Sequence, residues 1–338
     1  MKNFRHITSA ILALSLALTL TACGGKKEEA PAESGANAPA EATVEKYLIG
    51  INQYGQHASL DNCRIGFLQG LEEAGLKEGV DFEVDYQNAG FDDNVNAQIG
   101  DAFSAEDVDL MVGIATPSAV ACFNAAEDKD IPVIFTAITD PVQAKLDSGN
   151  VTGTSDMLPV EGQLKLIRQL QPDADTIGII YTTSESNSLY SIEVYNQMAG
   201  DYGFTIDAVA VTSQAEVTQA VDKLLADKVD CLSNLTDNNV VGVLPAILEK
   251  TDEAGVPVYG SEVEQVKLGC VAGAGLDYVK LGIQTGEMAA KVFKGETTCA
   301  DLPYEVIQNY DLYVNSTALA ALNIELPAEL ASTAVEVS

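Results

Sequence analysis

The sequence predicts an α/β fold of two Rossmann-like lobes, each built on a parallel β-sheet, with a cleft between them. From about Lys46 onward, short apolar runs alternate with amphipathic stretches of helical character. Strands that are apolar on both faces and separated by helices are typical of parallel sheets assembled from βαβ units. The same order of elements occurs twice, which indicates two similar lobes.

Eight segments have the apolar character of buried strands, and seven segments between them have helical periodicity. The expected strands are residues 47–52, 82–87, 110–115, 132–136, 176–181, 205–211, 230–235 and 256–260. The expected helices are residues 63–74, 95–105, 118–126, 160–169, 191–200, 216–226 and 241–253. Each expected helix therefore lies between two expected strands, as parallel pairing requires.

The two halves of the chain follow one plan. The strand that contains Ile49 and Ile51 is followed by a polar loop, a long helix and a second strand. The strand that contains Ile177 and Ile179 begins the same series in the second half. A single eight-stranded β/α barrel is the structural alternative. The irregular stretch 140–158 favours two lobes, because it is typical of a crossing between them.

The N-terminal segment has the pattern of a secretion signal. Residues 1–22 begin with a short basic region and continue into the apolar run 11–20, which is too short to span a bilayer comfortably. The run ends in Leu20-Thr21-Ala22-Cys23, which resembles the lipobox of bacterial lipoproteins. That resemblance implies cleavage before Cys23 and lipidation of its thiol. An ordinary secretory signal with an incidental cysteine is the alternative.

Residues 24–45 consist mainly of Lys, Glu, Ala, Pro, Ser and Gly. Such a segment buries too little apolar surface to offset its ordering entropy, so we expect residues 23–45 to be a lipidated N-terminus and a disordered tether. No later apolar stretch reaches transmembrane length. We therefore expect an extracytoplasmic body, anchored to the cell membrane by lipid.

Charge and cysteine content narrow the class of protein further. The formal net charge is −32, from 18 basic and 50 acidic residues, which argues against nucleic acid and anionic lipid headgroups as partners. Five cysteines follow Cys23 without CxxC spacing: Cys63, Cys122, Cys231, Cys270 and Cys299. We expect buried free thiols, and one long-range disulfide remains open.

Polar residues follow the expected strands at their carboxyl ends, where open parallel sheets bind their ligands. In the first half these are Gln53, Gln56, His57, Ser59, Thr116, Ser118, Thr139 and Asp140. In the second half they are Ser184, Glu185, Ser186, Asn187, Ser188, Thr236, Asp237, Asn238, Ser261 and Glu262. Helix capping alone is the alternative role for each of them.

The types of these residues indicate a zwitterionic ligand. Ser and Thr hydroxyls beside free backbone N–H groups suit a carboxylate, and an acid such as Asp237 suits an ammonium group. We therefore expect an amino-acid-like ligand. The residues from which we expect contacts are Gln56, His57, Thr116, Ser118, Thr139, Asp140, Ser186, Asn187, Ser188, Asp237, Asn238 and Ser261.

No set of residues in the sequence has the pattern of a catalytic or metal site. His57 is the single histidine after the expected signal, and no GxSxG-type nucleophile accompanies it. The sequence has no P-loop and no HExxH pattern, and Gly273-Ala274-Gly275 does not continue into GxGxxG. We expect a protein that is not an enzyme and that carries neither metal nor cofactor.

An ordered series of short motifs resembles the ABC-transporter substrate-binding family that includes the tryptophan- and tyrosine-binding lipoproteins. The resemblance covers residues 46–327 and includes Ile49-Gly50-Ile51-Asn52-Gln53, Ile114-Ala115-Thr116-Pro117-Ser118, Phe135-Thr136-Ala137-Ile138-Thr139-Asp140-Pro141, Thr236-Asp237-Asn238 and Gly275-Leu276-Asp277-Tyr278. It adds Asp277 to the expected ligand contacts. One departure is Ser261-Glu262-Val263, where relatives tend to have Ser-Asp-Thr.

The resemblance implies a type I periplasmic-binding-protein fold with three crossings between the lobes, near Ser155, Ser261 and Glu305. The N-terminal lobe would then comprise residues 46–155 and 262–305, and the C-terminal lobe residues 156–261 and 306–327. A tail of residues 328–338 would follow. The tail-side strand 311–314 would join the second lobe.

The resemblance also implies a function. We expect a solute-binding lipoprotein that binds an aromatic or other hydrophobic amino acid between its lobes and delivers it to an ABC permease. We expect it to act as a monomer. The alternative is a sensory ligand-binding module of the same fold that reports to a membrane signalling protein.

Overall fold

The structure is a computed structural model, and it describes residues 46–307 and 310–337. The expected signal, Cys23 and the tether lie outside these residues. Within the described part of the chain, no helix is both long and apolar enough to cross a membrane.

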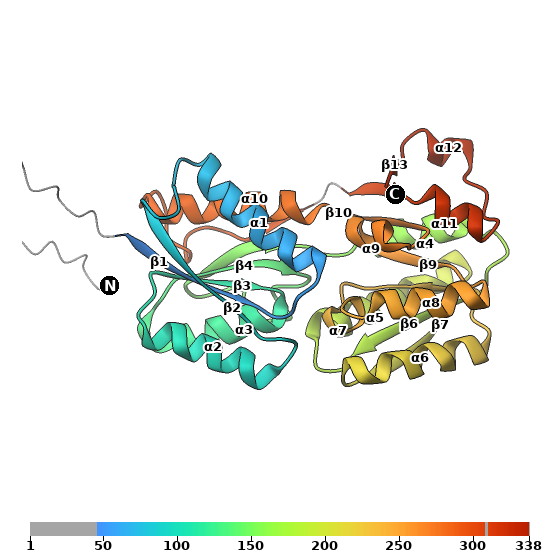
Figure 1. The fold of residues 1–338 in the computed structure, drawn as a ribbon, viewed down its shortest axis with the longest axis horizontal. Coiled ribbons are helices and arrows are strands. Elements are labelled where there is room, and N and C mark those ends of the chain that lie inside the picture. Colours follow the sequence, from blue (N-terminus) through green and yellow to red (C-terminus); the bar gives the residue numbers. More distant parts are fainter. Residues whose placement is uncertain (1–45, 308–309, 338) are drawn as a thin grey trace, which may run out of the picture. The chain divides into compact units, whose positions relative to one another are not determined.

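The first lobe is built on a sheet of six parallel strands (Figure 1). Their spatial order is β2 (Phe82–Asn88), β1 (Tyr47–Gln53), β3 (Leu110–Ile114), β4 (Val133–Ile138), β5 (Val151–Ser155) and β11 (Glu305–Val306). One face is covered by α1 (Ala58–Glu73) and α10 (Tyr278–Phe293). The other face is covered by α2 (Asp93–Ala105) and α3 (Thr116–Ala126), which continues into the short helix η1 (Glu127–Lys129).

The second lobe is built on a sheet of seven strands, in which β12 runs antiparallel to β10. Their spatial order is β7 (Thr205–Val211), β6 (Thr176–Thr182), β8 (Cys231–Ser233), β9 (Val258–Glu262), β10 (Ala272–Leu276), β12 (Asp311–Val314) and β13 (Val335–Glu336). The order β7-β6-β8-β9-β10 repeats the order β2-β1-β3-β4-β5 of the first lobe. The predicted duplication and the predicted two-lobed α/β fold are confirmed, and neither sheet closes into a barrel.

Helices cover both faces of the second sheet. The first group packs with one hydrophobic cluster and comprises α4 (Val160–Leu170), α5 (Ser186–Met198), η2 (Ala199–Tyr202), α11 (Ser316–Ala321) and α12 (Ala328–Ala331). The second group packs with another cluster and comprises α6 (Gln214–Asp227), α7 (Asn238–Val241), α8 (Leu244–Ala254) and α9 (Val263–Leu268). Adjacent strand residues alternate between the clusters, as Ile179 and Ile180 do, because successive side chains of a strand point to opposite faces.

The second crossing between the lobes lies later than predicted. The predicted boundary near Ser261 is wrong, because residues 263–276 form α9 and β10, and β10 pairs with β9 in the second sheet. The chain returns to the first lobe at Asp277, where α10 begins and packs against α1. The stretch Ala272–Leu276 has only small residues before Leu276, so it lacks the bulky apolar pattern by which we assigned the other strands.

The predicted tail is also part of the second lobe. Residues 328–338 were expected to follow the lobe, but they contain α12 and β13, and β13 pairs parallel with β12. β5, which we did not predict, lies inside the stretch 140–158 that we took as irregular. All five cysteines of the described residues are buried and free, as expected.

Candidate functional site

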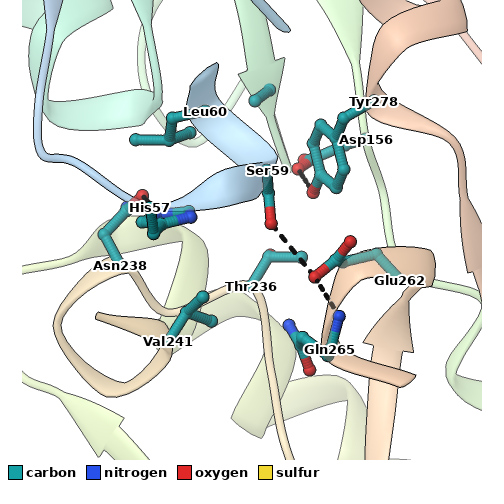
Figure 2. A pocket seen from close by; sticks show the side chains of 11 residues that line it. His57, Ser59, Leu60, Asp156, Thr236, Asn238, Val241, Glu262, Gln265 and Tyr278 are labelled. Carbon is teal, nitrogen blue, oxygen red and sulfur yellow. Dashed lines mark hydrogen bonds between the residues drawn. The ribbon is translucent and has the colours of Figure 1, made fainter. Parts of the chain in front are cut away.

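A small cavity lies between the lobes at the carboxyl ends of β1, β4, β8 and β9 (Figure 2). It is lined by His57, Ser59, Leu60, Ala137, Asp156, Thr236, Asn238, Val241, Glu262, Gln265 and Tyr278. Its volume of about 20 Å³ is enough for about one water molecule. Ligand pockets are typically hundreds of Å³ in volume, so a whole amino acid enters only when the lobes open, and the side chains that line the cavity must rearrange around it when the lobes close.

Backbone irregularity in the first lobe shapes one wall of the cavity. The register of β4 with β5 shifts between Phe135 and Ile138, and Ala137 has a left-handed backbone with φ of 59°. Such bulges redirect side chains and are frequent beside functional sites. The bulge leaves Ala137 on the cavity wall.

Hydrogen bonds join the lobes around the cavity. The Ser59 hydroxyl donates to Glu262 Oε1 at 3.0 Å, as Figure 2 shows, and Asn62 Nδ2 donates to Glu264 Oε1 at 3.0 Å. These two contacts connect the first turns of α1 to the beginning of α9. The Thr139 and Thr236 hydroxyls are 3.4 Å apart and form a further contact between the lobes.

Asp156 lies at the first crossing between the lobes and connects this segment to the second crossing. Its carboxyl accepts from the Thr139 hydroxyl at 3.1 Å and from the Tyr278 hydroxyl at 2.5 Å. Tyr278 directly follows the second crossing, so the two crossing segments share this carboxyl. Burial raises the pKa of Asp156, and the hydrogen bonds from Tyr278 and Thr139 oppose that shift.

Glu262 contributes a second carboxyl, from the second lobe. It ends β9 and caps α9 by accepting from Glu264 N and Gln265 N, in addition to the Ser59 hydroxyl. Burial raises the pKa of Glu262 to about 7, although these hydrogen bonds favour the charged form. The carboxyl therefore titrates near neutral pH.

His57 adds no positive charge to the cavity at neutral pH. Its ring lies parallel to that of Phe91, with 6.4 Å between the ring centroids, and its Nε2 is 3.5 Å from Asn238 Oδ1. Burial lowers the pKa of His57 to about 4. Its Nδ1 atom is buried without a hydrogen-bond partner in the described part of the chain.

A second pair of buried acids lies behind the cavity in the second lobe. Asp237 accepts from Thr182 N, the Thr182 hydroxyl, the Ser188 hydroxyl and Val240 N. Glu185 accepts from Asn187 Nδ2 and from the backbone N–H and side-chain Nδ2 of both Asn238 and Asn239. Burial is the main cause that raises the pKa of Asp237 and, to about 8, that of Glu185. This network fixes the loop that carries Thr236 and Asn238 into the cavity.

Of the residues predicted as ligand contacts, His57 and Asn238 line the cavity. Several others hold the strand ends in place: Ser118 donates to Asn96, Thr139 to Asp156, Asn187 to Glu185 and Ser188 to Asp237. Ser261 accepts from Gln265, Asp140 accepts from two N–H groups of its own turn, and Asp277 caps α10. Gln56 is exposed, Ser186 begins α5, and Thr116 is buried at the start of α3 with a hydroxyl that has no hydrogen-bond partner within residues 46–307 and 310–337.

Asp156, Tyr278 and Gln265 line the cavity but were not among the predicted contacts. Asp156 directly follows Ser155, the predicted first crossing, and Tyr278 directly follows Asp277, a predicted ligand contact. The signal that could have found them is the crossing itself, because residues of the crossing segments lie between the lobes. Gln265 follows the predicted boundary near Ser261, which was placed too early.

Two lobes of the same topology, with a cavity between their strand ends, define a two-lobed solute-binding protein. The chain belongs to the ABC transporter substrate binding protein family, whose sequence model matches residues 48–338. Proteins of this family bind solutes outside the cytoplasm and are not enzymes. Membership in the family therefore confirms two expectations, that the protein is not an enzyme and that it acts outside the cytoplasm.

Three similar proteins bear on the class of ligand. A tyrosine-binding protein of Clostridioides difficile (strain R20291) is 35% identical over 95% of this chain and 93% of its own length. A domain from Streptococcus pneumoniae in complex with L-Trp is 34% identical, with a TM-score of 0.83 over 87% of this chain and 100% of that one. A ligand-free, open substrate-binding protein from Clostridium difficile is 37% identical, with a TM-score of 0.64 over 86% and 100%.

Proposed function

We propose that this protein binds an aromatic amino acid, of the tyrosine or tryptophan type, in the cleft between its lobes and delivers it to an ABC permease. The observation that carries the proposal is the cavity lined by residues of both lobes, in a chain similar to an L-Trp complex and to a tyrosine-binding protein. A ligand that contacts both lobes stabilises their closed arrangement, which is the form a permease can distinguish.

The chemistry of the cleft supports an amino acid in particular. Two carboxyls reach the cavity, that of Asp156 at the first crossing and that of Glu262 in the second lobe, and a ligand ammonium group is a suitable partner for them. α1 begins at the cavity, and among the described residues no side chain caps it, so its first N–H groups can receive a carboxylate. Thr116 lies at the start of α3, and its buried hydroxyl has no hydrogen-bond partner among the described residues, so it can donate to a ligand carboxylate that reaches it.

Apolar and aromatic groups of the same cavity suit the side chain of such a ligand. Leu60, Ala137 and Val241 provide apolar surface, and the rings of His57 and Tyr278 provide stacking surface. A negatively charged side chain would be repelled by the two carboxyls that line the cavity.

Calorimetric titration tests this function. The protein is first freed of any bound ligand by partial unfolding and refolding, and is then titrated with L-tyrosine, L-tryptophan and L-phenylalanine, with D-glucose and L-glutamate as controls. We expect saturable heat with at least one aromatic amino acid and none with the controls. The absence of binding by all three aromatic amino acids would contradict the proposal.

We further propose that the mature protein is a monomer held to the membrane by lipid at Cys23, with residues 24–45 as a tether. Two or more acyl chains give stable anchoring, so the wild-type protein should sediment with membranes. Cys23→Ser should release it into the soluble fraction as a monomer in gel filtration. Equal membrane association of the two forms would contradict this assignment.

A further inference from the structure

Four carboxyl groups are buried around the cleft, and they differ in how completely they are hydrogen-bonded. A carboxylate offers about four acceptor positions. Asp237 accepts four hydrogen bonds and Glu185 accepts five, all from the second lobe. These two acids are saturated by their own lobe, and neither lines the cavity.

Asp156 and Glu262 retain acceptor capacity and face the cavity. Asp156 accepts two hydrogen bonds, from Thr139 and Tyr278, which leaves about two positions. Glu262 accepts three, from Ser59, Glu264 N and Gln265 N, which leaves about one. Together they offer about three free positions, the number of hydrogens that a primary ammonium group donates.

The surroundings of these two carboxyls supply no countercharge. No Lys or Arg lines the cavity, and within the described residues neither carboxyl takes part in an ion pair. The other titratable groups near them carry no positive charge at neutral pH. They are the neutral His57, the thiols of Cys63 and Cys270, the acid Glu264, and the hydroxyls of Tyr278, Tyr310 and Tyr313. Buried carboxyls without a cation either stay protonated or require a cation from outside.

We propose that Asp156 and Glu262, one at the first crossing and one from the second lobe, together bind the ammonium group of the ligand. The cavity between them has the volume of about one water molecule, which is also the size of an ammonium group. Because the two carboxyls belong to different parts of the molecule, the ammonium group connects the second lobe to the crossing segment. This inference rests on the proposed function, since it assigns a group of the amino-acid ligand.

A pair of ligands that differ only in the amine tests the assignment. The wild-type protein is titrated with the tighter-binding of L-tyrosine and L-tryptophan, and with the corresponding propionate that lacks the amine. We expect the wild-type protein to prefer the amino acid by a factor of 10 or more, the order of a charge-assisted hydrogen bond. Glu262→Gln and Asp156→Asn should each reduce this preference by about 10-fold.

Two further variants separate ligand recognition from lobe closure. Glu262→Asp keeps the charge and should retain most of the preference. Glu264→Gln alters an interlobe contact of the same helix, to Asn62, outside the cavity lining, so it should affect both ligands equally. Circular dichroism establishes that each variant is folded.

Several outcomes would overturn the inference. If the wild-type protein bound the amino acid and the propionate equally well, that result alone would overturn the inference. The inference would also be overturned if Glu262→Gln or Asp156→Asn kept the wild-type preference for the amino acid. It would likewise be overturned if Glu262→Asp and Glu262→Gln lost that preference equally. If the wild-type protein bound no amino acid, the proposed function itself would fail, whereas an unchanged preference refutes only this assignment.

Discussion

Glu262 shows at the scale of single residues how position in the fold sets the chemistry of a carboxyl. It is the N-cap of α9, a position that favours the ionised form through two backbone N–H donors. Ser59 of the first lobe covers it, and only 1% of its surface is exposed. Desolvation outweighs the cap, and the pKa of Glu262 is about 7.

The raised pKa of Glu262 predicts a dependence of stability on pH. Its pKa in the folded protein is about 7, above the value of about 4.3 in an unfolded chain. The folded state therefore binds more protons between these values, and stability falls as pH rises from 5 to 8. The contribution of this one group is about 2–3 kcal/mol.

Urea unfolding at pH 5 and pH 8, without added amino acid, measures this effect. Buried Glu185 shifts in the same direction, whereas buried His57, whose pKa is lowered to about 4, shifts in the opposite direction. The difference between the wild-type protein and Glu262→Gln therefore isolates the share of Glu262. In Glu262→Gln the loss should be smaller by about 2 kcal/mol. Equal losses in the variant and the wild-type protein would show that Glu262 does not titrate in this window.

The sequence analysis identified the strand ends that surround the site but could not rank their residues. His57 and Asn238 were predicted and line the cavity, whereas Asp237 was predicted to bind ammonium and is saturated by its own lobe. A sequence shows that an acid follows a strand, but it does not show how many N–H and O–H donors surround that acid. Burial and hydrogen-bond partners depend on tertiary structure, and they separate Glu262 from Asp237.

At the scale of elements, the contact between α1 and α10 explains how the chain returns to the first lobe after the second crossing. The two helices approach closely through paired glycines: Gly66 and Gly70 of α1, and Gly282 and Gly286 of α10. A Cβ atom at Gly282 would lie 2.2 Å from the carbonyl oxygen of Cys63. Since backbone atoms fill the space, only glycine fits there without moving a helix.

This packing also shows why some elements were harder to predict than others. Strands such as Thr205–Val211 were predicted with their observed bounds, because β-branched residues and alternation mark them. β10 has the sequence Ala-Gly-Ala-Gly-Leu, and we assigned no strand to it and no helix to α10. Their small residues serve close backbone approach: a Cβ atom at Gly275 would lie 2.2 Å from the carbonyl oxygen of Ser261.

Gly282→Ala should therefore destabilise the first lobe. The added methyl group forces α1 and α10 apart, and such overpacking typically costs about 1–3 kcal/mol. Gly200→Ala is the matched control, because a Cβ atom there meets no heavy atom within 4 Å. Thermal or urea unfolding should show the loss for Gly282→Ala and a change within about 0.5 kcal/mol for Gly200→Ala. Similar stabilities of the two variants would contradict this account of the helix contact.

At the scale of the whole molecule, closure of the lobes depends on contacts that need not touch the ligand. Ser59 lines the cavity, but Asn62 lies one turn further along α1 and is absent from the cavity lining. Its hydrogen bond to Glu264 joins the first lobe to the beginning of α9. A contact of this kind stabilises the closed arrangement whatever ligand is bound, and so contributes to affinity through the closed state.

Asn62→Ala should weaken amino-acid binding without altering ligand selectivity. Loss of one hydrogen bond to a partly exposed carboxylate costs about 0.5–1 kcal/mol, which corresponds to about a two- to five-fold change. Because the contact forms on closure, the change should appear mainly as faster dissociation in stopped-flow measurements. Gln69→Ala, which removes a hydrogen bond to Glu73 within α1, should leave the dissociation rate unchanged. If Asn62→Ala released the ligand at the wild-type rate, closure would not depend on this interlobe contact, and the Ser59–Glu262 and Thr139–Thr236 contacts would be the next to test.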